Sequence, residues 1–423
     1  MVVATQRAAV ERELSLREAV SLVEREYSCR GLRVDVSDAL TPEANFSYHI
    51  LVAELFDPSG ENITRGVGKG SGYQALASAL FEGFEHYALH VWRGCSRRMT
   101  LEEIAQQPGL VQCHFIQRMA KDFPAGRLDC IRFQPLLPSG NPEWFPVKLV
   151  NPAYASDIDD EAQLIGYFNY GSNSGSASGS TRSEALLHGL LELIERDGAS
   201  LAALDWFADP KRTVPSRVIR LQSFPEDLQA LAEFVRRNLG VEPAVINVTS
   251  DLGIPCVLAI PSQSIGDVGL GLFGAGASFS LGYAIERALG ELVQCYLGRK
   301  SPTVGSPTPL QCKYDLAELR RWPCISATAE LNPGQVLSLR EVIDFKEAEN
   351  LHRSTAEEQV PRISQILAKK GYQAWYYDWT GPDSQVAVVT VRVPELEHFF
   401  IHVAGFQAVL PTGRGWNRFA RPV

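Results

Sequence analysis

Apolar residues recur every three to four positions in several long segments of this chain, and that period predicts helices. The clearest example is TRSEALLHGLLELIERDGAS at residues 181–200, in which leucines cover one side and acidic residues the other. The predicted helices cover residues 14–28, 73–91, 181–200, 224–239, 281–298, 314–321 and 355–370.

Shorter apolar or alternating runs predict strands. Residues 47–57 and 63–72 flank the turn sequence PSGEN and are typical of a hairpin. Short strands are also expected within 129–166, and the remaining predicted strands are 241–250, 254–262, 372–379 and 385–393. Because several strand pairs are joined by short turns, the pattern favours an α+β fold with mostly antiparallel sheets over a doubly wound parallel sheet.

Two segments rich in small residues lead into helices. Residues 169–183, NYGSNSGSASGSTRS, contain too much Gly and Ser to predict a regular element, so we expect a loop there. Residues 269–280, GLGLFGAGASFS, form a second glycine-rich approach to a helix.

Three of the predicted helices carry polar residues in one common register. At about 100° per residue, Glu184, Glu192 and Glu195 fall within about 80° of one another, opposite the leucines. The shared spacing is Ser78-x3-Glu82-x2-Glu85, His188-x3-Glu192-x2-Glu195 and Arg287-x3-Glu291-x2-Gln294.

These acids allow two interpretations. Acidic residues three or four apart are common on solvated helix faces, but like charges at that spacing repel each other. No Lys lies within any of the three predicted helices to offset the repulsion. The repeated register therefore favours a shared polar site that holds a cation.

A magnesium–phosphate site fits these residue types. Mg²⁺ prefers oxygen ligands and shares its coordination shell with water and phosphate. Lys69, Arg196 and Arg287 could neutralise phosphate charge, and backbone N–H groups of the loop 171–180 could approach an anion. The sequence has no GxxxxGK[ST] phosphate loop and no GxSxG nucleophile motif.

Composition narrows the class of protein. The chain has 423 residues, 45% of them hydrophobic and 21% charged, and a formal net charge of −9, which is typical of a globular protein. Without a basic tract, nucleic-acid binding is not expected. No signal peptide or membrane span is found, and eight scattered cysteines without a CxxC motif favour a reduced, cytoplasmic protein.

Three sequence blocks resemble the YcaO family. They are GKGSGYQALASALFEGFEHY, NSGSASGSTRSEALLHGLLELIERD and GAGASFSLGYAIERALGELVQ. The second block is the most specific, because its small-residue loop, Glu184, Glu192, Glu195 and Arg196 occur together. The resemblance extends from about residue 65 to the C-terminus.

The resemblance implies a fold of several αβ units around a site for ATP and Mg²⁺. Family members activate a backbone amide by transferring phosphate to its oxygen after a nucleophile has attacked its carbon. An internal Cys, Ser or Thr side chain gives an azoline, and an external sulfur donor gives a thioamide. Such products belong to ribosomally made, post-translationally modified peptides, including antibiotics.

The resemblance also implies roles for individual residues. The expected Mg²⁺ ligands are Glu82, Glu85, Glu184, Glu192 and Glu195. The expected ATP-binding residues are Lys69, Ser78, Glu184, Arg196, Arg287, Glu291 and Gln294. Glu195 and Arg196 are the expected catalytic residues.

The chain departs from the family pattern in places. His86 follows Glu85 where Arg is usual, and the tail ends in ARPV, with Pro422 as its single proline, instead of a proline-rich segment. Residues 1–45 form an N-terminal extension whose helix either docks a partner or packs on the domain, and residues 46–423 form the catalytic domain. The basic tail containing Arg414 is either a flexible end or a substrate contact.

The expected function is ATP- and Mg²⁺-dependent activation of a peptide amide. The expected partners are a precursor peptide and a separate leader-recognition, E1-like or sulfur-delivery protein, and a homodimer is compatible with the sequence. Two alternatives stay open: thionation of a small-molecule amide, and a nucleotide-binding scaffold that assists a partner enzyme.

Overall fold

The computed structural model describes most of the chain. The described residues are 11–40, 47–94, 96–111, 113–155, 164, 167–168, 170–208, 214–266, 271–300, 323–347, 354–404 and 411–415. The short helix predicted over residues 314–321 lies outside them.

The N-terminal unit is an antiparallel three-stranded sheet with two helices. Its elements, in chain order, are α1 (Leu16–Cys29), β1 (Arg33–Asp38), β2 (His49–Phe56), β3 (Asn62–Gly70) and α2 (Tyr73–Val91). The strands follow the order β1-β2-β3, α2 covers β3, and α1 packs on α2. The predicted hairpin and both predicted helices are confirmed, whereas the exposed edge strand β1 was not predicted.

A second unit repeats this arrangement. Its elements, in chain order, are α7 (Glu226–Leu239), β9 (Pro243–Asn247), β10 (Cys256–Pro261), β11 (Gly274–Ala277) and α8 (Leu281–Lys300). The strands again form an antiparallel meander, with α8 on β11 and α7 against α8. Two strands extend the sheet beyond β9, and they form a parallel pair: β8 (Ser216–Ile219) and β12 (Arg340–Ile343).

A third unit has the same arrangement but is assembled from two distant parts of the chain. The later part supplies α12 (Ala356–Lys369), β13 (Trp375–Asp378) and β14 (Ala387–Arg392). The earlier part supplies β7 (Ser176–Gly179) and α6 (Arg182–Phe207). The strand order is β13-β14-β7, and α12 packs on α6 as α1 packs on α2.

Further elements surround these units. The sheet of the third unit continues beyond β13 with β5 (Arg127–Pro135) and then β4 (Arg97–Thr100). β6 (Glu143–Pro146) pairs with β5. The other α-helices of the described residues are α3 (Leu101–Ala105), α4 (His114–Asp122), α10 (Pro323–Glu330), α11 (Pro333–Val336) and α13 (Phe399–Ala404). The α+β fold with mostly antiparallel sheets is as predicted.

β7 lies where the sequence predicts a loop, so that prediction was wrong. Small residues are required there because the strand is in close contact with other backbone. A Cβ at Gly179 would lie 2.6 Å from the backbone nitrogen of Ala185, and one at Gly175 would lie 2.4 Å from the carbonyl oxygen of Val391. The Gly/Ser content therefore reflects close packing rather than the absence of regular structure.

The core consists of three hydrophobic clusters, and β10 contributes to two of them. β10 is buried on both faces: Cys256, Leu258 and Ile260 pack with α6, while Val257 and Ala259 pack with α7 and α8. Described residues of the predicted N-terminal extension belong to the same core as α2. None of the described helices has the length and apolar character needed to cross a membrane.

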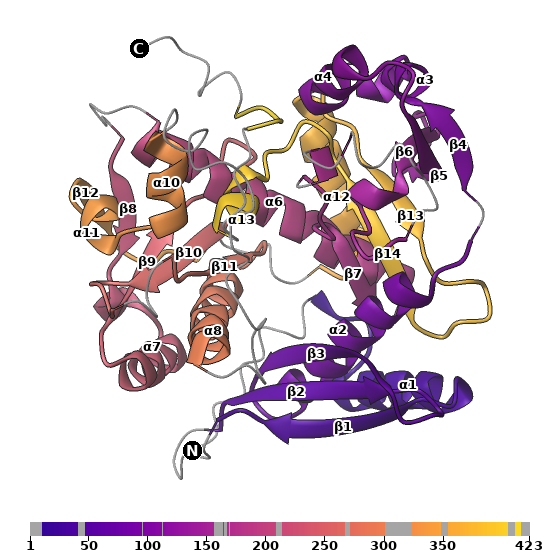
Figure 1. Cartoon of the computed structure of the whole chain (residues 1–423). Coiled ribbons are helices and arrows are strands. Elements are labelled where there is room, and N and C mark those ends of the chain that lie inside the picture. Colours follow the sequence, from indigo (N-terminus) through magenta and orange to yellow (C-terminus); the bar gives the residue numbers. More distant parts are fainter. Residues whose placement is uncertain are drawn as a thin grey trace.

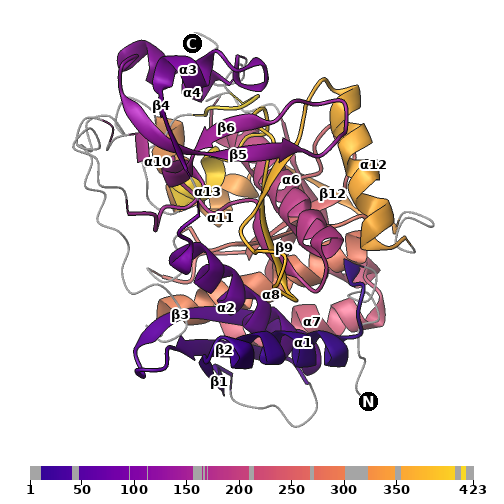
Figure 2. The same ribbon diagram turned by 90° about the vertical axis from the view of Figure 1, so that its right-hand side faces the viewer.

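The arrangement can be followed in two perpendicular views. The N-terminal sheet and α1 lie at one end of the molecule, and α3 and α4 lie at the opposite end (Figures 1 and 2). The three helices with the shared register, α2, α6 and α8, lie between these ends.

Candidate active site

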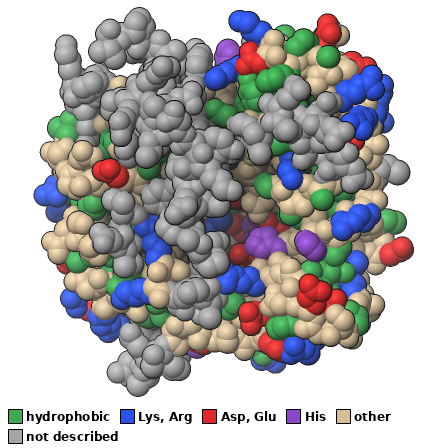
Figure 3. Space-filling view, in the orientation of Figure 1, with side chains coloured by type: hydrophobic (Ala, Val, Ile, Leu, Met, Phe, Trp, Pro, Cys, Tyr) green, Lys and Arg blue, Asp and Glu red, His purple; other side chains and the backbone are tan. Residues whose placement is uncertain are grey.

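The three helices α2, α6 and α8 open onto one cavity of about 400 Å³. A volume of this size suits a nucleotide-sized ligand. Acidic and histidine side chains gather at a hollow in the face seen in Figure 3. All nine positions of the shared register line the cavity: Ser78, Glu82, Glu85, His188, Glu192, Glu195, Arg287, Glu291 and Gln294.

Strands made of small residues place the helices close to the cavity. A Cβ at Gly68 in β3 would lie 2.0 Å from a carbonyl oxygen of α2, and one at Gly274 in β11 would lie 2.1 Å from a carbonyl oxygen of α8. Each helix therefore lies directly on the backbone of the strand that precedes it. The repeated strand–helix geometry explains why the same three positions of each helix face the same space.

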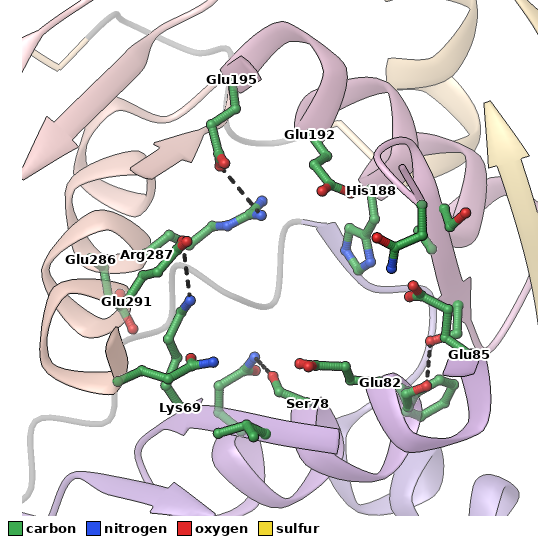
Figure 4. A pocket seen from close by; sticks show the side chains of 18 of the residues that line it. Lys69, Ser78, Glu82, Glu85, His188, Glu192, Glu195, Glu286, Arg287 and Glu291 are labelled. Atoms are coloured by element: carbon green, nitrogen blue, oxygen red, sulfur yellow. Dashed lines mark hydrogen bonds and ion pairs between the residues drawn. The ribbon is translucent and has the colours of Figure 1, made fainter. Parts of the chain in front are cut away.

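The labelled cations of the cavity lie on one side of it. Figure 4 shows Lys69 and Arg287 there, together with Glu286 and Glu291, while Glu82, Glu85 and Glu192 lie on the other side. A ligand that joins a cation to a polyanion matches this arrangement.

Arg196 holds two of the carboxylates. Its guanidinium lies 3.0 Å from Glu192 and 2.5 Å from Glu195, and the second oxygen of Glu195 is 3.9 Å from Arg287. Burial raises the pKa of Glu195, although Arg196 and Arg287 act against that shift. Nearby Glu195 and Glu192 outweigh burial and raise the pKa of Arg196, so the arginine is charged.

Lys69 pairs with Glu291 across two units. The ammonium nitrogen is 3.4 Å from the carboxylate, which also accepts a hydrogen bond from the backbone N–H of Ala275. Burial alone would raise the pKa of Glu291, but Lys69, Arg196 and Arg287 together lower it. Glu291 is therefore ionised and holds Lys69 at the cavity.

Glu82 and Glu85 have no cationic partner within ion-pair distance among the described residues. Burial raises the pKa of Glu85 well above its usual value, and Glu192 and Glu82 raise it further. The pKa of Glu82 is also raised, chiefly by burial. This pair of carboxylates needs a positive charge that no described side chain within ion-pair distance supplies.

Glu184 does not line the cavity. Its carboxylate is fully buried, lies 2.8 Å from Arg12, and accepts hydrogen bonds from the backbone N–H and hydroxyl of Ser180. The predicted contact of Glu184 with metal or nucleotide is therefore not supported. Glu184 instead forms an ion pair with Arg12, and Arg12 lines the cavity.

The sequence did not predict that the N-terminal segment contributes to the site. Arg12 reaches the cavity, and neighbouring Glu11 is buried beside it, 4.0 Å from Arg287 and hydrogen-bonded by the Ser278 hydroxyl at 2.5 Å. These contacts join residues more than 150 positions apart, and no sequence motif marks them.

Other lining residues were also absent from the predicted set. They include Tyr48, Gln74, Asn173, Ser176, Ser178, Tyr283 and Glu286. The glycine- and serine-rich segment 171–180 offered a signal for three of them, since we expected its backbone to approach an anion.

The two histidines of the cavity differ in environment. Burial, together with the charges of Arg12 and Arg287, lowers the pKa of His188 to about 3, so its ring is neutral. His86 hydrogen-bonds the carbonyl oxygen of Arg65 at 2.8 Å, which fixes the ring beside Glu82.

Mg²⁺ and a phosphate-bearing nucleotide fit these residues, although no three acidic, His or Cys side chains of the described chain converge to hold a metal alone. Mg²⁺ commonly takes one or two carboxylates and completes its shell with water and phosphate. Buried polar atoms without a hydrogen-bond partner include Arg12 Nε, Gln74 Oε1, Glu195 Oε2 and Arg196 Nε. All four belong to the cavity lining, where a polar ligand would satisfy them.

A family model matches residues 67–397 of the chain. It is described as a YcaO cyclodehydratase that binds ATP and Mg²⁺. The match covers all three register helices and every predicted site residue.

Two curated relatives are uncharacterized. One, from Methanothermobacter thermautotrophicus, is 27% identical over 339 residues, covering 78% of this chain and 80% of the relative. The other, described as lying in the tfuA 3' region of Rhizobium leguminosarum bv. trifolii, is 28% identical over 221 residues, covering 50% and 48%. This chain spans about half the length of the second relative.

Solved structures share the fold. YcaO from Methanopyrus kandleri, bound to AMPPCP and Mg²⁺, is 18% identical with a TM-score of 0.64, covering 92% of this chain and 93% of that one. A heterocyclase in complex with substrate and cofactor is 22% identical with a TM-score of 0.61, covering 92% and 53%. The E. coli microcin synthetase McbBCD complex with bound pro-MccB17 is 15% identical with a TM-score of 0.56, covering 86% and 88%.

Proposed function

This chain belongs to the YcaO family, and on that premise we propose that it activates a peptide backbone amide at the cavity between α2, α6 and α8. ATP and Mg²⁺ are the cofactors of the family, and the family description is that of a cyclodehydratase. The observation that carries the proposal is the convergence on one cavity of four cations with two carboxyl groups, Glu82 and Glu85, that have no ion-pair partner among the described residues.

The carboxylate side of the cavity would hold Mg²⁺. Glu82 and Glu85 need a positive charge, Glu192 lies near Glu85, and Glu195 lies near Glu192. Glu184 is left out of this ligand set because its oxygens bind Arg12 and Ser180.

The cations of the lining would hold phosphate groups. Lys69, Arg196 and Arg287 provide the positive charge, with Arg12 as a further cation and Ser78 as a hydroxyl partner. Glu291 holds Lys69, and Gln294 lies one helical turn beyond Glu291 in the same wall.

Catalysis in such a site depends on positioning and charge neutralisation. When bound, ATP supplies the phosphoryl group that turns the amide oxygen into a leaving group. Arg196 is fixed by Glu192 and Glu195, and Arg287 lies beside Glu195, so both guanidinium groups are held before a substrate arrives. Prepositioned cations stabilise developing negative charge without the cost of reorganising during the reaction.

The proposed substrate is a ribosomally made precursor peptide, and the proposed product is an azoline or a thioamide. Two structural neighbours support a peptide substrate, since one carries a bound substrate and another is a synthetase complex with bound pro-MccB17. The second also supports a separate partner protein, for which leader-recognition, E1-like and sulfur-delivery proteins are the candidates. Thionation of a small-molecule amide and a scaffold role are the alternatives.

The metal role is tested with Glu195→Gln, which keeps the size of the side chain and removes its charge. With peptide, partner, ATP and Mg²⁺ present, we expect product formation to fall by about a hundredfold or more, while ATP binding is retained. Glu54→Gln, an exposed position on β2, is the matched control. Unchanged product formation by Glu195→Gln would contradict the role of Glu195.

The product is identified by mass spectrometry of the modified peptide. Loss of one water indicates an azoline, and exchange of oxygen for sulfur indicates a thioamide. If ADP and phosphate are never released with any peptide amide, or if only a small-molecule amide is modified, the proposed function is wrong.

A further inference from the structure

A second, smaller cavity of about 50 Å³ lies behind the candidate active site. The same loop borders both cavities: Asn173 and Ser176 line the active-site cavity, while Ser172 and Ser174 line the second one. α6 also separates them, because Glu192 faces the first cavity and its neighbour Leu193 faces the second. A group bound in the second cavity would therefore lie one loop away from the reacting centre.

The second cavity contains a cation without an anionic partner. Arg392, the last residue of β14, stacks on the ring of Phe145, with its Cζ 3.1 Å from the ring centroid. Among the described residues, no carboxylate lies within ion-pair distance of this guanidinium and no acceptor makes a hydrogen bond with it. Arg392 is half-buried, so water reaches part of the guanidinium. A small anion that replaces this water would gain a charge-assisted contact with it.

The groups around Arg392 do not balance its charge. Burial lowers the pKa of Arg392 to about 9, and the shift is opposed only by Cys113 and Glu395. Burial and Arg392 lower the pKa of His398 to about 4, so that ring is neutral, and burial raises the pKa of the Cys113 thiol. Burial also raises the pKa of Glu395 to about 7, so this carboxyl group is only partly ionised at neutral pH.

The size and walls of the cavity limit what it can hold. A water molecule occupies roughly 30 Å³ in the liquid, so the cavity accepts a group of a few atoms. The other walls are largely apolar and include Phe115, Leu149 and Val150. A carboxylate matches both constraints, because it is small, planar and complementary to the two-pronged guanidinium.

We propose that this second cavity is a carboxylate-binding subsite for the peptide substrate, with Arg392 as the residue that holds the carboxylate. The inference rests on the proposed function in one respect: the molecule that bears the carboxylate is taken to be a peptide. The carboxylate comes either from the C-terminus of the peptide or from an Asp or Glu side chain close to the modified amide. Arg392 is thus a specificity-determining residue for the reaction at the neighbouring cavity.

The subsite is tested by direct binding of small probes to the full chain, followed by ligand-observed NMR at pH 7.5. N-acetylglycine models a peptide C-terminus, the α-amide of N-acetylaspartate models an acidic side chain, and N-acetylglycinamide is the neutral control. We expect at least one acid to bind and the neutral amide not to bind. The acid that binds more tightly identifies the source of the carboxylate.

Variants then locate the binding. Arg392→Gln should weaken binding of the acid by about tenfold or more, as loss of a charge-assisted contact requires, and Arg392→Lys should weaken it less. Arg132→Gln is the matched control, because Arg132 is an exposed arginine in the same sheet. Equal binding of acid and amide, no binding of either acid, or unchanged binding by Arg392→Gln would show that the cavity holds only water.

The experiment distinguishes a failure of the carboxylate subsite from a failure of the proposed function. ATP binding is measured on the same samples, so failure to bind ATP would contradict the proposed function while the probe titrations still decide the subsite. If Arg392→Gln does not fold, the comparison of acid with amide on the unmodified chain decides it alone.

Discussion

Glu85 lies close to two other carboxyl groups, and no described residue within ion-pair distance supplies a counter-charge. It is partly buried, it lies near Glu82 and Glu192, and its pKa is raised well above the usual value. A folded protein tolerates such repulsion where function requires it, and stability is the usual cost.

We therefore expect Glu85→Gln to make the metal-free protein more stable. Removing one of three repelling carboxylates should raise the free energy of unfolding by about 1 kcal/mol, measured by urea denaturation in EDTA. The same variant should bind ATP more weakly when Mg²⁺ is present. Glu54→Gln should change neither quantity, and a less stable Glu85→Gln protein would contradict the repulsion argument.

The helical register predicted which side chains face the site, but not how far along each helix they reach it. Glu184 shares the acidic face of its helix, yet it lies in the first turn of α6, where Ser180 and Arg12 take its oxygens. A helical projection contains no information about position along the axis. Arg12 could not be found from the sequence because its contact with Glu184 spans 172 residues.

At the scale of elements, the positions of the helices depend on the strands of small residues on which they pack. β3, β7 and β11 supply the close backbone contacts. The sequence predicted β3 as a strand, but it predicted a loop at β7 and only a glycine-rich approach to a helix at β11. The sequence showed glycine-rich segments before helices, but composition does not distinguish a loop from a strand packed against a helix backbone. That distinction depends on what the glycines touch.

Gly68→Ala tests the close packing of β3 and α2. The new methyl group would lie 2.0 Å from a backbone carbonyl oxygen of α2, so the helix must shift and carry Ser78 and Glu82 with it. We expect a loss of about 3 kcal/mol in the free energy of unfolding, measured by chemical denaturation, together with weaker ATP binding. Gly381→Ala is the control, since a Cβ there meets nothing within 4 Å, and equal effects of the two would contradict the packing argument.

At the scale of the whole molecule, a buried ion pair fastens the C-terminal segment to the site. Arg414 binds Asp197, the residue after Arg196 in α6, and also reaches Asp251 at 2.5 Å. The sequence left the tail as either a flexible end or a substrate contact, and the structure fixes Arg414 in these ion pairs. Residues 416–423 lie outside the described residues. The pairing depends on residues 217 positions apart, which local patterns cannot reveal.

Breaking this pair should be costly because Asp197 is fully buried. We expect Arg414→Gln to lower the free energy of unfolding by about 3 kcal/mol, measured by denaturant titration. The double variant Asp197→Asn/Arg414→Gln should recover part of the loss, because no buried charge is left unpaired. Additive effects of the two substitutions would show that the groups do not interact.

Glu397 should give the molecule a measurable pH dependence. Burial raises its pKa from 4.5 to about 7, so the folded state binds a proton that the unfolded state releases. Its stabilising contribution is complete below about pH 4.5 and is lost as pH rises through about 7.

Between pH 5.5 and 7.5, the unmodified protein should lose up to about 2 kcal/mol of stability relative to Glu397→Gln. Urea denaturation at the two pH values measures this difference. Glu54→Gln should follow the unmodified protein, and parallel pH profiles for Glu397→Gln and the unmodified protein would contradict the assignment.

The divided third unit has a consequence for synthesis on the ribosome. β7 and α6 are translated long before β14, yet β7 pairs with β14 over four residues. While the chain is being made, the helix that carries Glu192, Glu195 and Arg196 must wait for its last strands, since such long-range pairing forms late. A ribosome that stalls before residue 387 would therefore release a chain with two complete units and an unfinished third, and we expect such truncated chains to be degraded rather than to hydrolyse ATP without a substrate.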